Sequence, residues 1–66
     1  MEYVYLVYDE CCLEGVYRSE AEATKRVLDI ATNEQEIDTE STPLDFNNED
    51  EFGWYDCNWS RVELKG

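Results

Sequence analysis

Carboxylates dominate the residues of this chain that could do chemistry. Seventeen acidic residues face five basic ones, so the formal net charge is −12. Glu34, Glu36, Asp38 and Glu40 occupy every second position of one segment. If that segment is extended, the four carboxylates point to the same side, roughly 6.6 Å apart. Phosphates of a DNA strand rise about 3.4 Å each and lie further apart through space, so such a row presents a charge pattern like that of a nucleic-acid backbone.

A second group of carboxylates lies among aromatic residues further along the chain. Aromatic side chains are enriched at the centres of protein–protein interfaces, and this mixture therefore favours a partner-binding surface. Core packing is the alternative for the two tryptophans. The candidate partner-binding residues are Glu34, Glu36, Asp38, Glu40, Asp45, Glu49, Asp50, Glu51, Asp56, Trp54, Tyr55 and Trp59.

The charge is unevenly distributed along the sequence. Residues 27–60 hold ten carboxylates and no Lys or Arg, which leaves 17 − 10 = 7 acidic residues with the five basic ones. A magnitude of about 2–8 is enough to keep a small domain soluble, and −12 exceeds it. The excess predicts a basic protein partner. The open alternative is a solvated acidic loop in an accessory interaction protein, where the acidity serves solubility alone.

Calcium binding is a further alternative for the same residues. Asp45, Asn47 and Glu49 occupy the first, third and fifth positions of a possible calcium loop, and Asp56 falls at the twelfth. However, Asp50 stands where such loops need glycine for a sharp turn, and the twelfth ligand is usually Glu. The spacing is therefore a partial match, and no cofactor or metal is expected.

The residue types that enzymes use most are missing or poorly placed. The chain has no histidine, the commonest general base. Ser19, Ser41 and Ser60 consequently have no histidine to activate them. Cys11 and Cys12 lie among acidic residues, which disfavour the thiolate form that a nucleophile needs. Three cysteines at these spacings do not make a zinc site. We predict a binding protein, not an enzyme.

The elements that position these residues can be located from the pattern. Glu2–Asp9 is rich in aromatic and β-branched residues on both faces, which predicts a central strand. A second strand is expected at Cys12–Tyr17. Ser19 and Glu22 form a capping box that opens a helix ending near Asn33.

The second half of the chain is less regular. Residues 34–53 contain Pro43 and Gly53 and read as a long connection or a short extra strand, anchored by apolar side chains at Leu44, Phe46 and Phe52. Trp54–Lys65 has strand character, and Val62 and Leu64 alternate there with Arg61, Glu63 and Lys65, which predicts a half-buried strand. These elements predict one α+β domain over residues 1–66, with a small antiparallel sheet of three to four strands and one helix on one face, in the order β-β-α-β.

Composition also bears on partners and compartment. Affinity for nucleic-acid phosphates and anionic lipids comes from Lys and Arg, so neither direct nucleic-acid binding nor membrane binding is expected. The chain has no apolar run near 18 residues, and its first eight residues lack the basic start of a signal peptide. An odd number of cysteines is a poor disulfide framework. A reduced, cytoplasmic protein is expected.

Two resemblances add to this interpretation. The segment Tyr3–Tyr8, with Gly15-Val16-Tyr17, Ser19 and Ala23, resembles a loose group of small phage and bacterial domains, which supports the fold alone. In size and acidity the whole chain is similar to the DNA-mimic proteins that lytic phages use in host takeover, among them inhibitors of the bacterial nucleoid protein HU. That resemblance implies an inhibitor that blocks the DNA-binding surface of a host protein, with HU the first candidate, in the host cytoplasm at the nucleoid.

Overall fold

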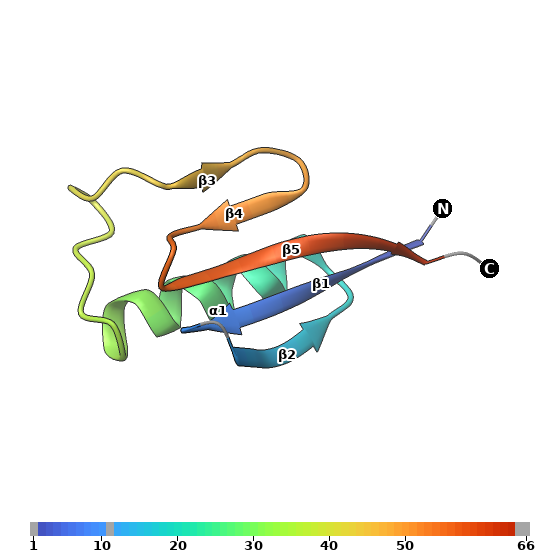
Figure 1. Cartoon of the computed structure of the whole chain (residues 1–66), viewed down its shortest axis with the longest axis horizontal. Coiled ribbons are helices and arrows are strands. Elements are labelled where there is room, and N and C mark those ends of the chain that lie inside the picture. The colour runs from blue at the N-terminus through green and yellow to red at the C-terminus, as the bar shows by residue number, and fades with distance from the viewer. Residues whose placement is uncertain (1, 11, 65–66) are drawn as a thin grey trace.

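The computed structural model describes residues 2–10 and 12–64 of the chain. In that part of the chain, five antiparallel strands form one sheet in the order β2-β1-β5-β4-β3, and one helix packs on one of its faces (Figure 1). The elements are β1 (Glu2–Asp9), β2 (Cys12–Tyr17), α1 (Glu20–Asn33), β3 (Phe46–Asn47), β4 (Glu51–Gly53) and β5 (Cys57–Leu64).

Strand β1 lies at the centre of the three long strands, as its apolar residues on both faces predict. It pairs with β2 through contacts such as Leu6 with Val16, and with β5 along its whole length. The turn between β1 and β2 places Glu10 at a φ of 50°, in the left-handed region. The predicted bounds of β1 and β2 are confirmed.

Helix α1 begins and ends where its sequence signals predict. The Ser19 hydroxyl oxygen accepts a hydrogen bond from the Glu22 backbone N–H at 3.1 Å, which satisfies one of the free donors of the first turn. The helix buries a stripe of small and branched side chains at helical spacing against the sheet, namely Ala23, Val27, Ile30 and Ala31.

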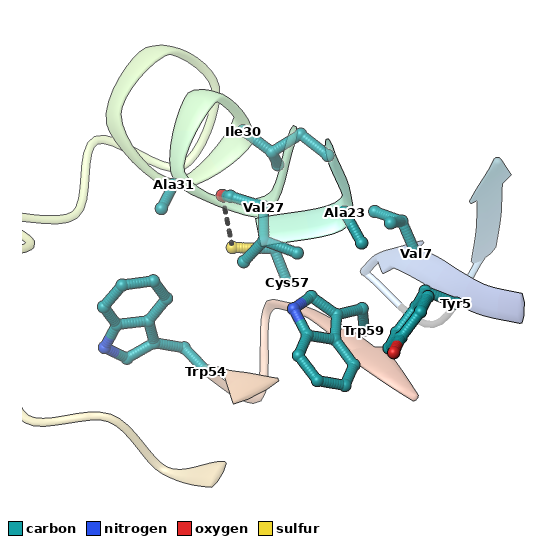
Figure 2. Packing of buried hydrophobic residues seen from close by; sticks show 9 residues of the cluster. All are labelled: Tyr5, Val7, Ala23, Val27, Ile30, Ala31, Trp54, Cys57 and Trp59. Atoms are coloured by element: carbon teal, nitrogen blue, oxygen red, sulfur yellow. Dashed lines mark hydrogen bonds between the residues drawn. The ribbon is translucent and has the colours of Figure 1, made fainter. Parts of the chain in front are cut away.

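The core lies between α1 and the sheet (Figure 2). Trp59 is its largest member on β5. The Tyr5 ring meets it edge-on at 5.0 Å between centroids, and the Phe52 ring stacks on it at 6.0 Å. Its indole N–H donates to the Thr24 hydroxyl on α1 at 3.0 Å, so this tryptophan joins helix and sheet.

The sheet has five strands, whereas three to four were expected, because residues 45–53 form a short hairpin. The Asn48 side-chain oxygen accepts from the backbone N–H groups of Asp50 and Glu51, at 2.8 and 2.9 Å, and thereby builds the turn. Gly53 ends β4 at a φ of 128°, where a Cβ would lie 2.5 Å from the Cys57 carbonyl oxygen. Local turn chemistry of this kind produces strands too short to show a hydrophobic period.

Strand β5 also differs from the expectation in one respect. Val62 and Leu64 were expected on the buried side of a half-buried strand, but they are 41% and 44% exposed. The alternate residues Cys57 and Trp59 face the helix instead. Among the described residues, no helix is long and apolar enough to cross a membrane.

Candidate partner-binding surface

The carboxylates of residues 34–40 are all exposed, but they do not form an extended row. The helix is followed by a turn, and Glu36 has a φ of 52°. The Ile37 N–H donates to the Ala31 carbonyl at 2.7 Å, which folds the chain back onto the end of α1. The regular spacing of roughly 6.6 Å expected for a strand therefore does not apply to these four residues.

Asp38 organises a turn within this segment. Its carboxylate accepts from the Ser41 hydroxyl at 2.6 Å and from the Glu40 backbone N–H at 3.2 Å. The Ser41 hydrogen bond, assisted by the Glu40 N–H, holds the pKa of Asp38 below its usual value. Asp38 is consequently a structural residue as well as a surface charge.

Apolar side chains and two hydrogen bonds hold the long connection against the domain. Ile37 and Leu44 pack on the core, and Phe52 does so from β4. The Trp54 indole N–H donates to the Thr42 carbonyl at 3.3 Å, and the Gln35 side-chain amide donates to Asp9 at 2.7 Å. The connection is ordered by these contacts without any regular strand between residues 34 and 45.

Three carboxylates of the hairpin have partners within the fold. Asp45 accepts from the Tyr55 backbone N–H at 3.1 Å. Asp50 accepts from the Arg61 guanidinium at 3.0 Å, and Glu49 lies 3.9 Å from the same group. Arg61 thus fixes the hairpin turn to β5 and partly neutralises it.

The expected aromatic anchors fall into two classes. Trp54 and Trp59 are only 4% and 2% exposed and belong to the core, so a partner cannot reach them in this fold. Their expected role as anchors does not fit their burial, because both indoles are needed to fill the space under the helix. Tyr55 is 75% exposed and its ring contacts Phe46 edge-on at 5.1 Å between centroids. It is the one accessible aromatic of the three.

We define the acidic edge as the nine expected carboxylates: Glu34, Glu36, Asp38, Glu40, Asp45, Glu49, Asp50, Glu51 and Asp56. All are exposed except Glu51, which is half-buried. The segment that carries them runs from the end of α1 through the long connection, the β3–β4 hairpin and the turn before β5, along the left and upper sides of the molecule in Figure 1. Within the described residues, their ion-pair partners are Arg26, which lies 3.7 Å from Glu34, and Arg61. Glu36, Glu40 and Asp56 have no ion pair there.

The carboxylates also affect the thiol of Cys57. Cys57 is fully buried, and its Sγ lies 3.8 Å from the Val27 carbonyl (Figure 2). Burial, reinforced by the negative charges of Asp9, Asp56 and Glu34, raises the pKa of this thiol to about 11. Cys12 is exposed, and the expectation for Cys11 falls outside the described residues.

The calcium-loop residues do not converge on a common point. Asn47 lies in β3, and Asp45 holds the Tyr55 N–H. The part of the chain that the structure describes contains no group of three or more His, Cys, Asp or Glu side chains placed to hold a metal ion.

Sequence reasoning missed the two arginines that tie the fold together. Arg26 on α1 makes two hydrogen bonds to one Glu14 oxygen on β2, at 2.8 and 3.0 Å. The Arg61 guanidinium lies 4.3 Å from the centroid of the Tyr3 ring as well as on Asp50. Their isolation in an acidic chain was the available signal, because each of few cations must satisfy several anions.

Comparisons with known proteins give no relative. No protein-family model, no curated protein and no solved structure matches this chain.

Proposed function

We propose that this chain is a DNA mimic that binds the basic DNA-binding surface of a host protein and excludes DNA from it. The observation that carries the proposal is the acidic edge, whose nine carboxylates include six that lack an ion pair in the described part of the chain: Glu36, Asp38, Glu40, Asp45, Glu51 and Asp56. A bacterial nucleoid protein such as HU is the first target to try, on the strength of the resemblance in size and acidity.

The proposed binding rests on the same electrostatic contribution that drives the binding of proteins to DNA. Proteins bind DNA largely by neutralising phosphates with Lys and Arg, and the released counterions make affinity fall steeply with salt. Exposed carboxylates on a chain of net charge −12 engage the same cations. The long-range field of such a protein also speeds the encounter with a basic partner.

The backbone of the acidic edge suits this role because it is fixed. Hydrogen bonds of Asp38, Asp45 and Asn48 hold the turns, and Arg61 holds the hairpin. Carboxylates on an ordered backbone keep their mutual spacing, which reduces the ordering cost that a flexible acidic tail would meet on binding. The acidic edge would therefore offer a partner carboxylates in a fixed arrangement, in addition to a large total charge.

An affinity experiment tests the proposal. The chain is immobilised and exposed to bacterial lysate and, separately, to purified HU, and bound protein is eluted with a salt gradient and with duplex DNA. Polyglutamate on the same support is the control for charge alone. We expect a DNA-binding protein that the control does not retain and that duplex DNA releases. Retention equal to that of polyglutamate, or protein that DNA fails to release, would contradict mimicry and leave the acidity as a solubility device.

A further inference from the structure

The face of the sheet opposite α1 is apolar and uncovered. We call it the open face and define it by Val4, Leu6 and Tyr8 on β1, Leu13 and Val16 on β2, and Val62 and Leu64 on β5. Register places these side chains together, since Leu6 pairs with Val16, Tyr8 with Leu13 and Val4 with Val62. In Figure 1 the helix lies behind β1 and β5, and no described element covers their other side.

Several large apolar side chains of the open face are exposed. Leu13 and Val16 are each 56% exposed, and Val62 and Leu64 are 41% and 44% exposed. They make up four of the six large apolar residues that the structure leaves exposed in its described part. Scattered apolar residues need no explanation, but a contiguous exposed patch marks an interaction site. The buried face of the same strands already provides the core, so folding alone does not require apolar side chains here.

Charge surrounds the open face without entering its centre. Glu2 pairs with Leu64 at one end of it, where Arg18 lines the same pocket as Val4 and Leu64, and Glu51 pairs with Ser60 on the side toward β4. Residues directly opposite in an antiparallel pair lie on the same face, so both carboxylates border the patch. The border thus carries two carboxylates and one guanidinium, and on a chain of net charge −12 such a face is complementary to an apolar surface with a basic border.

This charge pattern favours a basic partner over a second copy of the chain as the occupant of the open face. A second copy would bring another net charge of −12 to the same interface. Like charges across an interface cost several kcal/mol. A partner that carries Lys or Arg around an apolar centre has the opposite sign at the same positions, so it gains both the apolar burial and the ion pairs.

We propose that the open face docks a protein surface with an apolar centre and a basic border. Its side chains supply affinity that salt does not remove, because apolar burial is not screened as charge pairs are. The surface adjoins the acidic edge at Glu51 but is distinct from it. A partner held by both surfaces keeps part of its affinity at a salt concentration that abolishes purely electrostatic binding.

The test uses the full chain and two defined peptides, so it does not depend on the identity of any DNA-binding protein. One peptide has three central leucines flanked on each side by two lysines, and the other has serines in place of the leucines. Chemical-shift mapping with the leucine peptide is expected to perturb Leu6, Leu13, Val16 and Val62. The serine peptide is expected to perturb only acidic residues. Shifts confined to the acidic edge with both peptides would overturn the proposal.

A matched pair of variants sharpens this result. The double variant Leu13→Ser/Val16→Ser is expected to bind the leucine peptide at least about tenfold more weakly at every salt concentration, with an unchanged salt slope. Leu28→Ser is the control, because Leu28 is an exposed apolar residue on α1, away from the open face. Equal weakening in both variants would contradict a specific face. Chemical shifts of the core confirm that each variant is folded.

Sedimentation equilibrium of the free chain tests whether a second copy occupies the open face. The proposal expects a monomer at physiological salt. A dimer that Leu13→Ser/Val16→Ser dissociates and Leu28→Ser does not would overturn the proposal in favour of a second copy.

Discussion

The framework of β1, β2, α1 and β5 and the segment of residues 34–56 are held together in different ways. The framework pairs long strands and buries a helical stripe, and its described ion pair joins Arg26 to Glu14. The 34–56 segment carries the acidic edge and is attached by a few anchors, such as Leu44, Phe52 and Trp54. A small domain can therefore carry a large unbalanced charge if it is confined to a segment that a few apolar anchors attach to the core.

The tryptophan that joins these two regions should give the largest effect. Trp59→Ala removes the ring that contacts Tyr5 and Phe52 and the hydrogen bond to Thr24. We expect a loss of about 3–5 kcal/mol in the free energy of unfolding, which is much of the stability of a domain this size. Urea denaturation followed by tryptophan fluorescence measures it. Tyr55→Ala, at an exposed position, is the control, and equal losses in the two variants would show that Trp59 does not join the regions.

Gly53 is the point where the hairpin meets the framework strand. Gly53→Ala should destabilise the protein by about 1–3 kcal/mol from the backbone conformation alone, and the Cβ would also lie 2.7 Å from the Asn58 Cα. Gly15→Ala is the matched control, because its Cβ would meet only the Tyr17 ring, at 3.2 Å. Thermal unfolding of both variants compares the sites. A Gly53→Ala variant as stable as Gly15→Ala would contradict the described position of the hairpin.

The buried thiol of Cys57 should make the stability of the folded protein depend on pH. Its pKa is raised from 9.0 to about 11 in the folded protein, so the unfolded thiol releases its proton first. Between these values the folded state binds more protons, and stability falls as pH rises. The stabilising contribution is complete below pH 9 and is lost toward pH 11. We expect the melting temperature of the native chain to fall more steeply over this range than that of Cys57→Ala. Parallel pH profiles would contradict a buried thiol near the carboxylates.

The ion pair within the framework should give the smallest effect. Arg26 and Glu14 are partly exposed, and pairs of this kind contribute about 0.2–1 kcal/mol. Glu14→Gln should lower stability by that amount at low salt and by less at high salt, whereas Glu63→Gln should have little effect. The Arg26 hydrogen bond lowers the pKa of Glu14, so its stabilisation exists above the unfolded value of 4.5 and fades as pH falls. Denaturant melts at two salt concentrations and two pH values check both expectations.

The framework could be predicted from the sequence because its signals are local and periodic. The capping box at Ser19 and the apolar pattern of Glu2–Asp9 each fix an element through neighbouring residues. The 34–56 segment could not, because its turns depend on single side chains, such as Asp38 and Asn48, and on the φ of Gly53. Trp54 and Trp59 were predicted either as interface anchors or as core residues, and the structure places both in the core. Their burial depends on long-range packing that no local pattern shows.

The composition of β1 was also ambiguous. Apolar residues on both faces predicted a central strand, and β1 does lie between β2 and β5, but the helix covers only the face that carries Tyr5 and Val7. Sequence alone could not distinguish a second buried face from an interaction surface, because both need the same residue types. The position of α1 settles which face remains open.

Under the proposed mimicry, the position of the carboxylates matters for binding, and not only their number. Two variants of equal net charge, −12 + 3 = −9, separate these effects. One is Glu36→Gln/Glu40→Gln/Asp56→Asn, which neutralises exposed acids of the acidic edge. The other is Glu10→Gln/Glu20→Gln/Glu63→Gln, which neutralises three exposed acids elsewhere.

The measurement is the salt concentration at which the retained DNA-binding protein elutes from each immobilised variant. Our account predicts that the edge variant releases its partner at clearly lower salt than the other variant, which stays close to the native chain. Elution of both variants at the same salt concentration would show that only total charge attracts the partner, and would contradict the acidic edge as a binding surface.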